Sequence, residues 1–542
     1  MKQYTIGVDF GTLSARAVLV QIQDGAVIAA AECAYPHGVM SDALPSGKRL
    51  GRGWALQHPM DYLQALEEII PKLMQASGIS AHQVAGIGTD FTCSTTLPTL
   101  ADGTPLCTLP AFSDEPNAYV KLWKHHADSQ AQRIEAIARE MDISWLRNTG
   151  GRISPEWPLP KLLQVLEEAP ALFEQTDVYL EAGEWIVWLL TGRLTRSASL
   201  ADSKNFHEKG YPPAAFYARV HPRFSDILEK QFRGQVIPLT GCAGYLTEEM
   251  ANRLSLVPGI PVSPVMVDSQ AGAPGAGLSG PGVLLSVLGT SACHILMSND
   301  NLDITGIAAK SMDGILPGLC NYEANQSMGE VLAWFIENAC PSACREEAEA
   351  RGISLHQLMN EKASLLPPGG RGLVALDWFN GNRSILVDSQ LSGMLLGLTL
   401  RTKPEEIYRA LMEASAYTMR TIVENYENQG LPIHQLIVSG GIARKSPLLM
   451  QIISDVTGRE IHISSAREGP AQGVAIVAAA GAGVYPDLPA AIAAMGQPVE
   501  KVYSPSADTA RYDQLFQEFL QLHDYFGRGG NDIMHRLAQI ND

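Results

Sequence analysis

The chain opens with a strand and a turn on which the fold prediction rests: Gly7-Val8-Asp9-Phe10-Gly11-Thr12-Leu13-Ser14-Ala15-Arg16. An apolar stretch precedes Asp9, so the carboxylate ends a buried strand. A tight turn bearing Gly, Thr and Ser follows, and such a turn can direct N–H and hydroxyl groups toward phosphate oxygens while Asp9 holds hydrated Mg²⁺. An ordinary hairpin with an Asp turn is the alternative for this segment.

The surrounding sequence indicates a mixed α/β fold. Strand patterns cover 4–10 and 15–22, and Asp24-Gly25 marks the turn into a third strand that starts at Ala26. Helical periodicity over 59–76 and 117–141 flanks a strand pattern at 84–89. Antiparallel hairpins combined with α/β units predict an α/β protein.

A similar pattern returns about 280 residues later. A strand is predicted over 283–288, the turn Gly289-Thr290-Ser291 follows, and a return strand covers 292–297. Alone, this turn is a common strand end. Paired with the first turn, it predicts two copies of one domain type whose turns hold a nucleotide's phosphates from opposite sides.

Two further segments carry chemistry. An apolar strand delivers Asp268 ahead of a run of small residues, where a carboxylate can accept the proton of an attacking hydroxyl. The alternative is an Asp that caps a Gly/Ala-rich helix. Residues 436–446 read as a strand, the diglycine Gly440-Gly441 and a helix from about Pro447, and glycines let a flat ring approach the backbone. The alternative is a turn that requires positive φ.

Size and charge limit the function classes. The 542 residues suit two large domains with a tail, which we place at 1–257, 258–505 and 506–542. A net charge of −17 disfavours nucleic acid and anionic membranes as partners. The start lacks a secretory pattern and the eight cysteines form no CxxC pair, so we expect free thiols in the cytoplasm.

Other motifs carry less. Residues 275–280 match GxGxxG but precede a strand, which disfavours a dinucleotide fold. His125 and His126 are adjacent and cannot share a helix face, so we expect surface or partner contacts there and no metal site.

Together, in this order, the four segments resemble the FGGY family of carbohydrate kinases. The resemblance implies two actin-like/RNase H-like ATPase domains of the hexokinase/Hsp70/actin fold with an interdomain cleft. Five segments resemble the ribulokinase branch in particular: 86–92, 121–126, 150–157, 181–188 and 376–381.

The resemblance also implies roles for single residues. Asp268 would be the catalytic base, and the phosphates of ATP would lie near Gly11, Thr12, Ser14 and Arg16 on one side and Gly289, Thr290 and Ser291 on the other. Gly440 and Gly441 would face the adenosine, and the sugar would meet Cys93, Lys204, Asp268 and Glu323. The expected substrates are MgATP and a small ketopentose, L-ribulose.

Alternatives remain at this point. Another pentulose or pentitol, such as xylulose, would use the same nucleotide segments. A non-catalytic sugar or nucleotide sensor and an assembly-forming ATPase are the alternatives from other classes. The oligomeric state is open, with a homodimer among the options.

Overall fold

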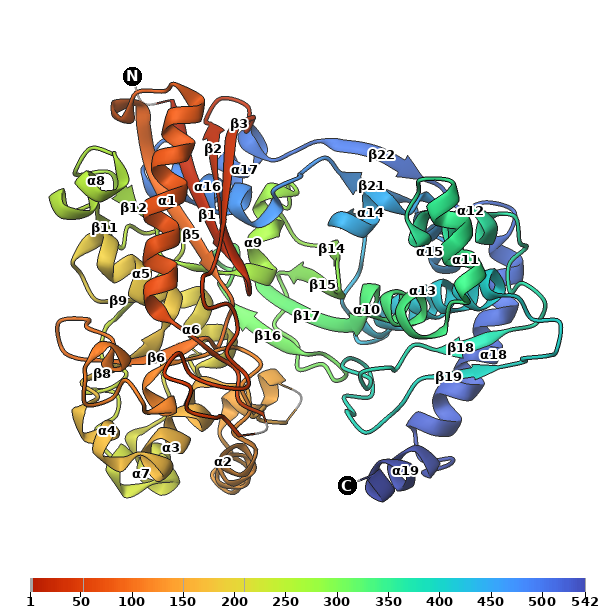
Figure 1. Cartoon of the computed structure of the whole chain (residues 1–542), viewed down its shortest axis with the longest axis horizontal. Coiled ribbons are helices and arrows are strands. Elements are labelled where there is room, and N and C mark those ends of the chain that lie inside the picture. Colours follow the sequence, from red (N-terminus) through yellow and green to blue (C-terminus); the bar gives the residue numbers. More distant parts are fainter. Residues whose placement is uncertain (1–2, 52, 150, 209, 542) are drawn as a thin grey trace. The chain divides into compact units, whose positions relative to one another are not determined.

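The computed structural model describes residues 3–541 except 52, 150 and 209. Contacts group the chain into two compact units that interleave along the sequence (Figure 1). The first unit comprises 1–280, 310–321 and 468–497, and the second comprises 281–309, 322–467 and 498–542. The contiguous division at 257 and 505 stays a prediction, because a cut along the sequence and a grouping by contacts are different descriptions.

A seven-stranded sheet is the centre of the first unit. The hairpins expected at the N-terminus are present as antiparallel β1 (Tyr4–Phe10), β2 (Ser14–Gln21) and β3 (Val27–Ala34). On the other side of β1 lies parallel β5 (Val84–Phe91), which also pairs with β12 (Pro261–Val262) and β13 (Met266–Val267). The short β11 (Gly244–Tyr245) completes the sheet.

Glycines bring a helix directly onto one face of this sheet. Helix α16 (Gly469–Gly481) contacts β1 and β5, and a Cβ on Gly7 or Gly88 would lie 1.8 or 2.0 Å from a backbone oxygen of α16. Helix α9 (Asp268–Gly275) packs on α16 with the same closeness, since a Cβ on Gly473 would lie 1.7 Å from the Ala271 oxygen. Only glycine permits such backbone contact.

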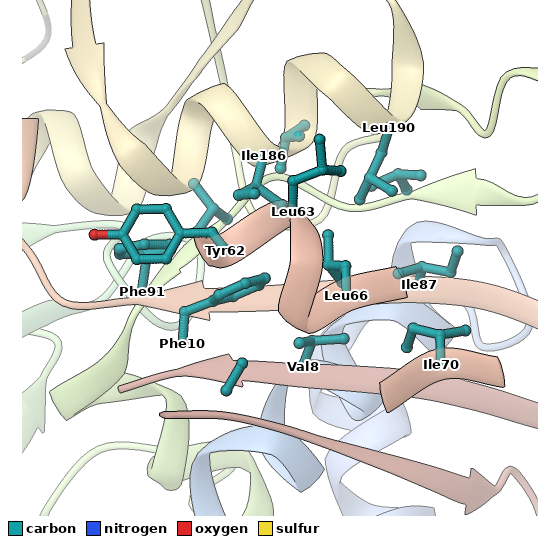
Figure 2. Close-up of a cluster of buried hydrophobic side chains, with 14 of the residues drawn as sticks. Val8, Phe10, Tyr62, Leu63, Leu66, Ile70, Ile87, Phe91, Ile186 and Leu190 are labelled. Carbon is teal, nitrogen blue, oxygen red and sulfur yellow. The ribbon is translucent and has the colours of Figure 1, made fainter. Parts of the chain in front are cut away.

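Apolar side chains cover the opposite face. Helix α1 (Pro59–Ser77) lies across it, and its Tyr62 ring makes edge contacts with Phe10 and Phe91 (Figure 2). Leu66 and Ile70, one and two turns further along α1, extend this cluster. Burial of such side chains stabilises the fold by about 1.5–3 kcal/mol each.

The first unit also contains a smaller, four-stranded sheet and several helices. The strands of this sheet are β4 (Leu56–Gln57), β6 (Thr96–Thr99), β7 (Val120–Lys121) and β8 (Val178–Glu181). A separate two-stranded sheet is formed by β9 (Thr195–Ser197) and β10 (Gln235–Ile237). Besides α1, α9 and α16, the described α-helices of the unit are α2 (Asp128–Glu140), α3 (Pro158–Glu168), α4 (Pro170–Gln175), α5 (Ala182–Thr191), α6 (Ala198–Lys204), α7 (Ala214–Val220), α8 (Glu248–Leu254) and α17 (Leu488–Met495).

Another seven-stranded sheet forms the centre of the second unit, and the grouping by contacts assigns its residues 310–312 and 320–321 to the first unit. Its order is β16 (Ala309–Met312), β17 (Cys320–Ser327), β15 (Ser291–Ser298), β14 (Val283–Leu288), β20 (Gln435–Ser439), β21 (Ile461–Ser464) and β22 (Val499–Tyr503). A hairpin is formed by β18 (Val374–Leu376) and β19 (Met394–Leu396). The helices are α10 (Gly329–Trp334), α11 (Ser342–Ala350), α12 (Leu355–Ser364), α13 (Pro404–Asn428), α14 (Gly441–Lys445), α15 (Pro447–Thr457), α18 (Thr509–Gly527) and α19 (Ile533–Asn541).

One expected element is wrong in its extent. The helix predicted over 117–141 begins only at Asp128, because Val120 and Lys121 pair with β4 and β6 instead. Tertiary pairing overrides helical periodicity there. Within the described residues, no helix has the length and apolar character needed to cross a bilayer.

Candidate active site

The first Gly-Thr turn is closed by its own backbone. Gly11 N–H donates to the Ser14 carbonyl over 3.0 Å. The Gln57 side chain donates to the Thr12 carbonyl (2.8 Å), and Trp123 Nε1 donates to Thr12 Oγ1 (3.1 Å). The Thr12 hydroxyl proton remains available to a ligand, since this contact uses only the oxygen as acceptor.

Two carboxyl groups meet at the end of the central strands. Asp9 of β1 and Asp90 of β5 are register partners. Burial, followed by the charges of Asp9 and Asp268, raises the pKa of Asp90 well above its usual range, and burial also raises the pKa of Asp9. No N–H or hydroxyl group of the described residues reaches the two buried oxygens of Asp90. Carboxylate oxygens of this kind fit a hard divalent cation such as Mg²⁺.

Arg16 is held by acidic side chains. It pairs with Glu32 (3.1 Å) and with Glu468 (3.0 Å), which precedes α16, while Ser14 Oγ donates to Glu32 as well. The expected phosphate contacts of Ser14 and Arg16 stay predictions. A ligand there would compete with Glu32 for both side chains.

Three expected sugar residues lie in one neighbourhood of the first unit. Cys93 is buried just after β5, Lys204 ends α6 and Asp268 begins α9. Burial raises the pKa of the Cys93 thiol to about 12, the Lys204 charge lowers it, and the Glu181 and Asp268 charges raise it. The thiol is therefore neutral near pH 7, which suits contact with a hydroxyl and excludes nucleophilic attack.

Helices α6 and α9 are tied together near their starts. The Val267 N–H, just before Asp268, donates to Ser199 Oγ (3.2 Å), and Ser197 Oγ donates to the Val265 carbonyl. Asp268 Oδ1 accepts from the Ser269 N–H over 2.7 Å. The N-capping alternative is wrong, since Val267 is the N-cap and Asp268 is the first residue of α9.

The second Gly-Thr turn, at Gly289-Thr290-Ser291, is held by backbone hydrogen bonds. Gly289 N–H donates to the Ser291 carbonyl (3.0 Å), as Gly11 does in the first turn. The N–H groups of Gly329 and Glu330, at the start of α10, donate to the carbonyls of Gly289 and Thr290.

Gly440 lies against the strand that leads into this turn. Its φ is +99°, and a Cβ there would lie 2.3 Å from the Leu288 oxygen, whereas Gly441 faces open space. The alternative reading, a turn that requires positive φ, is thus correct for Gly440. It leaves an adenosine role for Gly441 open.

Glu323 lies on β17 of the second unit and is half-buried. Asn325 Nδ2 donates to Glu323 Oε1 over 3.2 Å, and the Ala308 N–H donates to the Glu323 carbonyl. Its sugar role stays a prediction.

Several histidines and cysteines lie outside this site. Of the two histidines expected to make surface or partner contacts, His126 is exposed. The expectation is wrong for His125, because its ring is buried 2.8 Å from Gln164 Oε1 in a polar cluster that includes Lys121. Three possible metal ligands, His37, His58 and Asp61, have donor atoms within 4.8 Å of one another. Their polar atoms already form the His37–Asp61 pair and the cap of α1. All eight cysteines are free, as expected.

Family comparison resolves the class of the protein. Residues 4–275 match the N-terminal domain, and residues 284–482 the C-terminal domain, of the "FGGY family of carbohydrate kinases". The chain belongs to this family. It is therefore a carbohydrate kinase, a phosphotransferase with the two-domain actin-like fold that the resemblance implied.

Curated FGGY relatives extend over the full length. The chain is 44% identical to the ribulokinase of Halalkalibacterium halodurans, over 99% of this chain and 97% of the relative. It is 43% identical to the ribulokinase of Mycolicibacterium smegmatis, over 99% and 96%.

Solved structures of sugar and glycerol kinases share the fold. A xylulose kinase from Rhodospirillum rubrum aligns with a TM-score of 0.80 at 23% identity, over 99% of this chain and all of that one. Plasmodium falciparum glycerol kinase with ADP aligns with a TM-score of 0.72 at 15% identity, over 96% and 97%. At these identities the likeness supports the fold alone.

Some residues around this site were missed from the sequence. Asp90 had a visible signal, since Gly88-Thr89-Asp90-Phe91 repeats the pattern of Gly7-Val8-Asp9-Phe10. Glu181 and Lys161 had none, because their role depends on contacts 67 to 87 residues apart in the chain.

Proposed function

We propose that the protein transfers the γ-phosphate of ATP to the C5 hydroxyl of L-ribulose, forming L-ribulose 5-phosphate. The observation that carries this proposal is the shared neighbourhood of Cys93, Lys204 and Asp268 in a chain 44% identical to a ribulokinase along its length. A buried thiol, an ammonium and a carboxylate suit a ketose with several hydroxyls.

Asp268 is the proposed general base. Its carboxylate accepts the proton of the C5 hydroxyl as that oxygen bonds to phosphorus and the bond to the leaving ADP oxygen breaks. The Ser269 N–H holds the carboxylate at the start of α9, which fixes its orientation before the sugar arrives.

The phosphates are assigned to the two Gly-Thr turns. Gly11, Thr12, Ser14 and Arg16 in the first unit, and Gly289, Thr290 and Ser291 in the second, supply N–H, hydroxyl and guanidinium donors. Gly440 and Gly441 are assigned to adenosine and Glu323 to the sugar. Asp9 would hold Mg²⁺, which would neutralise charge on the transferred phosphoryl group.

The test is ADP release from MgATP with L-ribulose, D-ribulose, L-xylulose, D-xylulose and glycerol in parallel. We expect L-ribulose to give the highest kcat/KM. If D-xylulose or glycerol is decisively better, the kinase class stands and the ribulose assignment fails. If none of these substrates stimulates ADP release, the proposed reaction fails, and a sensor becomes the better explanation.

A further inference from the structure

The backbone of Ser94 has an unusual conformation beside Cys93. Ser94 has a φ of +64°, in the left-handed region that non-glycine residues seldom adopt. Such a conformation persists only where neighbouring groups enforce it. Two buried side chains do so here, one at each polar group of the Ser94 backbone.

Glu181 holds the N–H of Ser94 and Lys161 holds its carbonyl. Glu181 Oε1 accepts from Ser94 N over 3.1 Å. Lys161 Nζ donates to the Ser94 carbonyl over 2.7 Å and to the Leu122 carbonyl over 2.8 Å. Glu181 is 2% exposed and Lys161 fully buried, so both contacts are shielded from water.

The same oxygen of Glu181 reaches the other side of the sugar neighbourhood. Asn205 Nδ2 donates to Glu181 Oε1 over 3.2 Å, and Asn205 directly follows Lys204. One carboxylate oxygen therefore joins the residue after Cys93 to the residue after Lys204. A shift of Glu181 would move both proposed sugar-binding positions relative to each other.

Burial of this carboxylate is costly. Burial, aided by the charge of Glu184, raises the pKa of Glu181 to about 8, against the opposing effect of Lys161. Glu181 Oε2 has no hydrogen-bond partner among the described residues. An apolar residue would avoid this cost, so the carboxylate is explained by its polar contacts, which are those of Oε1 with Ser94 and Asn205 and its place as the N-cap residue of α5.

We propose that Glu181 is a positioning residue that sets the spacing of Cys93 and Lys204 through Ser94 and Asn205, and thereby the enzyme's affinity and selectivity for its ketopentose. This inference rests on the proposed function. It adds that selectivity depends on a residue that does not itself touch the sugar.

The experiment compares four variants of the full-length enzyme. Asn205→Ala removes only the hydrogen bond between Asn205 and Glu181, next to Lys204. Glu181→Ala removes this hydrogen bond and also the one from the Ser94 N–H, next to Cys93. Glu181→Gln keeps an acceptor oxygen for both donors. Tyr179→Phe is the matched control, because it removes a buried hydrogen bond to Thr96 (2.7 Å) from the same strand and leaves the hydrogen bonds of Glu181 to Ser94 and Asn205 in place.

The variants should change the KM for the sugar and leave the KM for ATP nearly unchanged. We expect the KM for L-ribulose to rise about tenfold in Asn205→Ala, and more in Glu181→Ala, with the KM for ATP within about twofold of wild type. The preference for L-ribulose over D-ribulose should fall in both. Glu181→Gln should recover most of the affinity, and Tyr179→Phe should change stability only.

The outcomes distinguish this inference from the proposed function. If the wild type is active and Asn205→Ala has the same sugar KM and the same selectivity, the positioning role is overturned. It is also overturned if Tyr179→Phe raises the sugar KM as much as Asn205→Ala does. A wild type that prefers another sugar refutes the ribulose assignment, and the same variants then test positioning with that sugar. Should Glu181→Ala fail to fold, Asn205→Ala and Glu181→Gln decide the question.

Discussion

Asp9 and Asp90 occupy matching positions on adjacent parallel strands, and the next residues, Phe10 and Phe91, stack with ring centroids 5.1 Å apart. The two strands thus end with the same acidic–aromatic pair, and the rings of Phe10 and Phe91 lie in the hydrophobic core cluster (Figure 2). Stacked rings fix the register of the strands, since a slip by one residue would exchange the two faces. The carboxyl pair therefore depends on core packing beneath it.

Removal of the proposed base should slow turnover strongly and leave the fold intact. We expect Asp268→Asn to lower kcat by about 10²–10⁴-fold, because an amide cannot accept the hydroxyl proton. The amide oxygen can still accept from the Ser269 N–H, so the unfolding free energy should change by less than about 1 kcal/mol. Steady-state kinetics measure kcat, and thermal unfolding measures the stability. Asp487→Asn, at the start of α17, is the control, and near-wild-type activity of Asp268→Asn would refute the assignment.

The two adjacent glycines after β20 should respond differently to a methyl group. Gly440→Ala should lower the unfolding free energy by more than about 2 kcal/mol, because of its positive φ and the Leu288 oxygen 2.3 Å from the new Cβ. Gly441→Ala, which faces open space, should keep full stability. If Gly441 faces adenosine, its variant should raise the KM for ATP and leave the KM for sugar unchanged. Equal destabilisation of the two variants would contradict the structure.

Close packing of α9 on α16 should control the position of Asp268. Gly473→Ala places a Cβ 1.7 Å from the Ala271 oxygen, so the helices must separate. We expect a loss of about 3 kcal/mol or more in stability, together with a fall in kcat as α9 moves. Gly469→Ala in the same helix is the control, since its nearest atom would be 3.9 Å away. Denaturant unfolding and kinetics of both variants check this; a stable, fully active Gly473→Ala would be inconsistent with it.

Stability should decrease below pH 6.5 in part through His294. This ring is fully buried, 2.8 Å from Ser286 Oγ, and burial lowers its pKa from 6.5 to about 4. Between these values the unfolded chain binds more protons than the folded one, so stability is present above pH 6.5 and is lost as the pH falls toward 4. The contribution is about 3 kcal/mol.

The double variant Ser286→Ala/His294→Leu removes both partners of this hydrogen bond. Its unfolding free energy should fall less steeply between pH 6.5 and 4 than that of the wild type. Urea unfolding at several pH values measures the slope, and His82→Asn on the surface is the control. An unchanged slope in the double variant would exclude His294 as the cause.

Much of this protein could be predicted from the sequence. Local signals located the hairpins at 4–34, the Gly289 turn and the strand–diglycine–helix after 435, because turn residues and apolar periodicity act over a few residues. The same signals indicated Asp9 and Asp268, each of which comes directly after an apolar residue of a short strand. Family membership followed from the order of these segments.

The tertiary structure decided what depends on distant contacts. It delayed the start of the helix expected over 117–141 to Asp128, since β7 pairs with β4 and β6, and it placed His125 in the interior. It also joined Ser94, Lys161, Glu181 and Asn205, which no local pattern connects. Periodicity reports which face of an element is buried, whereas hydrogen bonds between remote elements depend on how those elements pack.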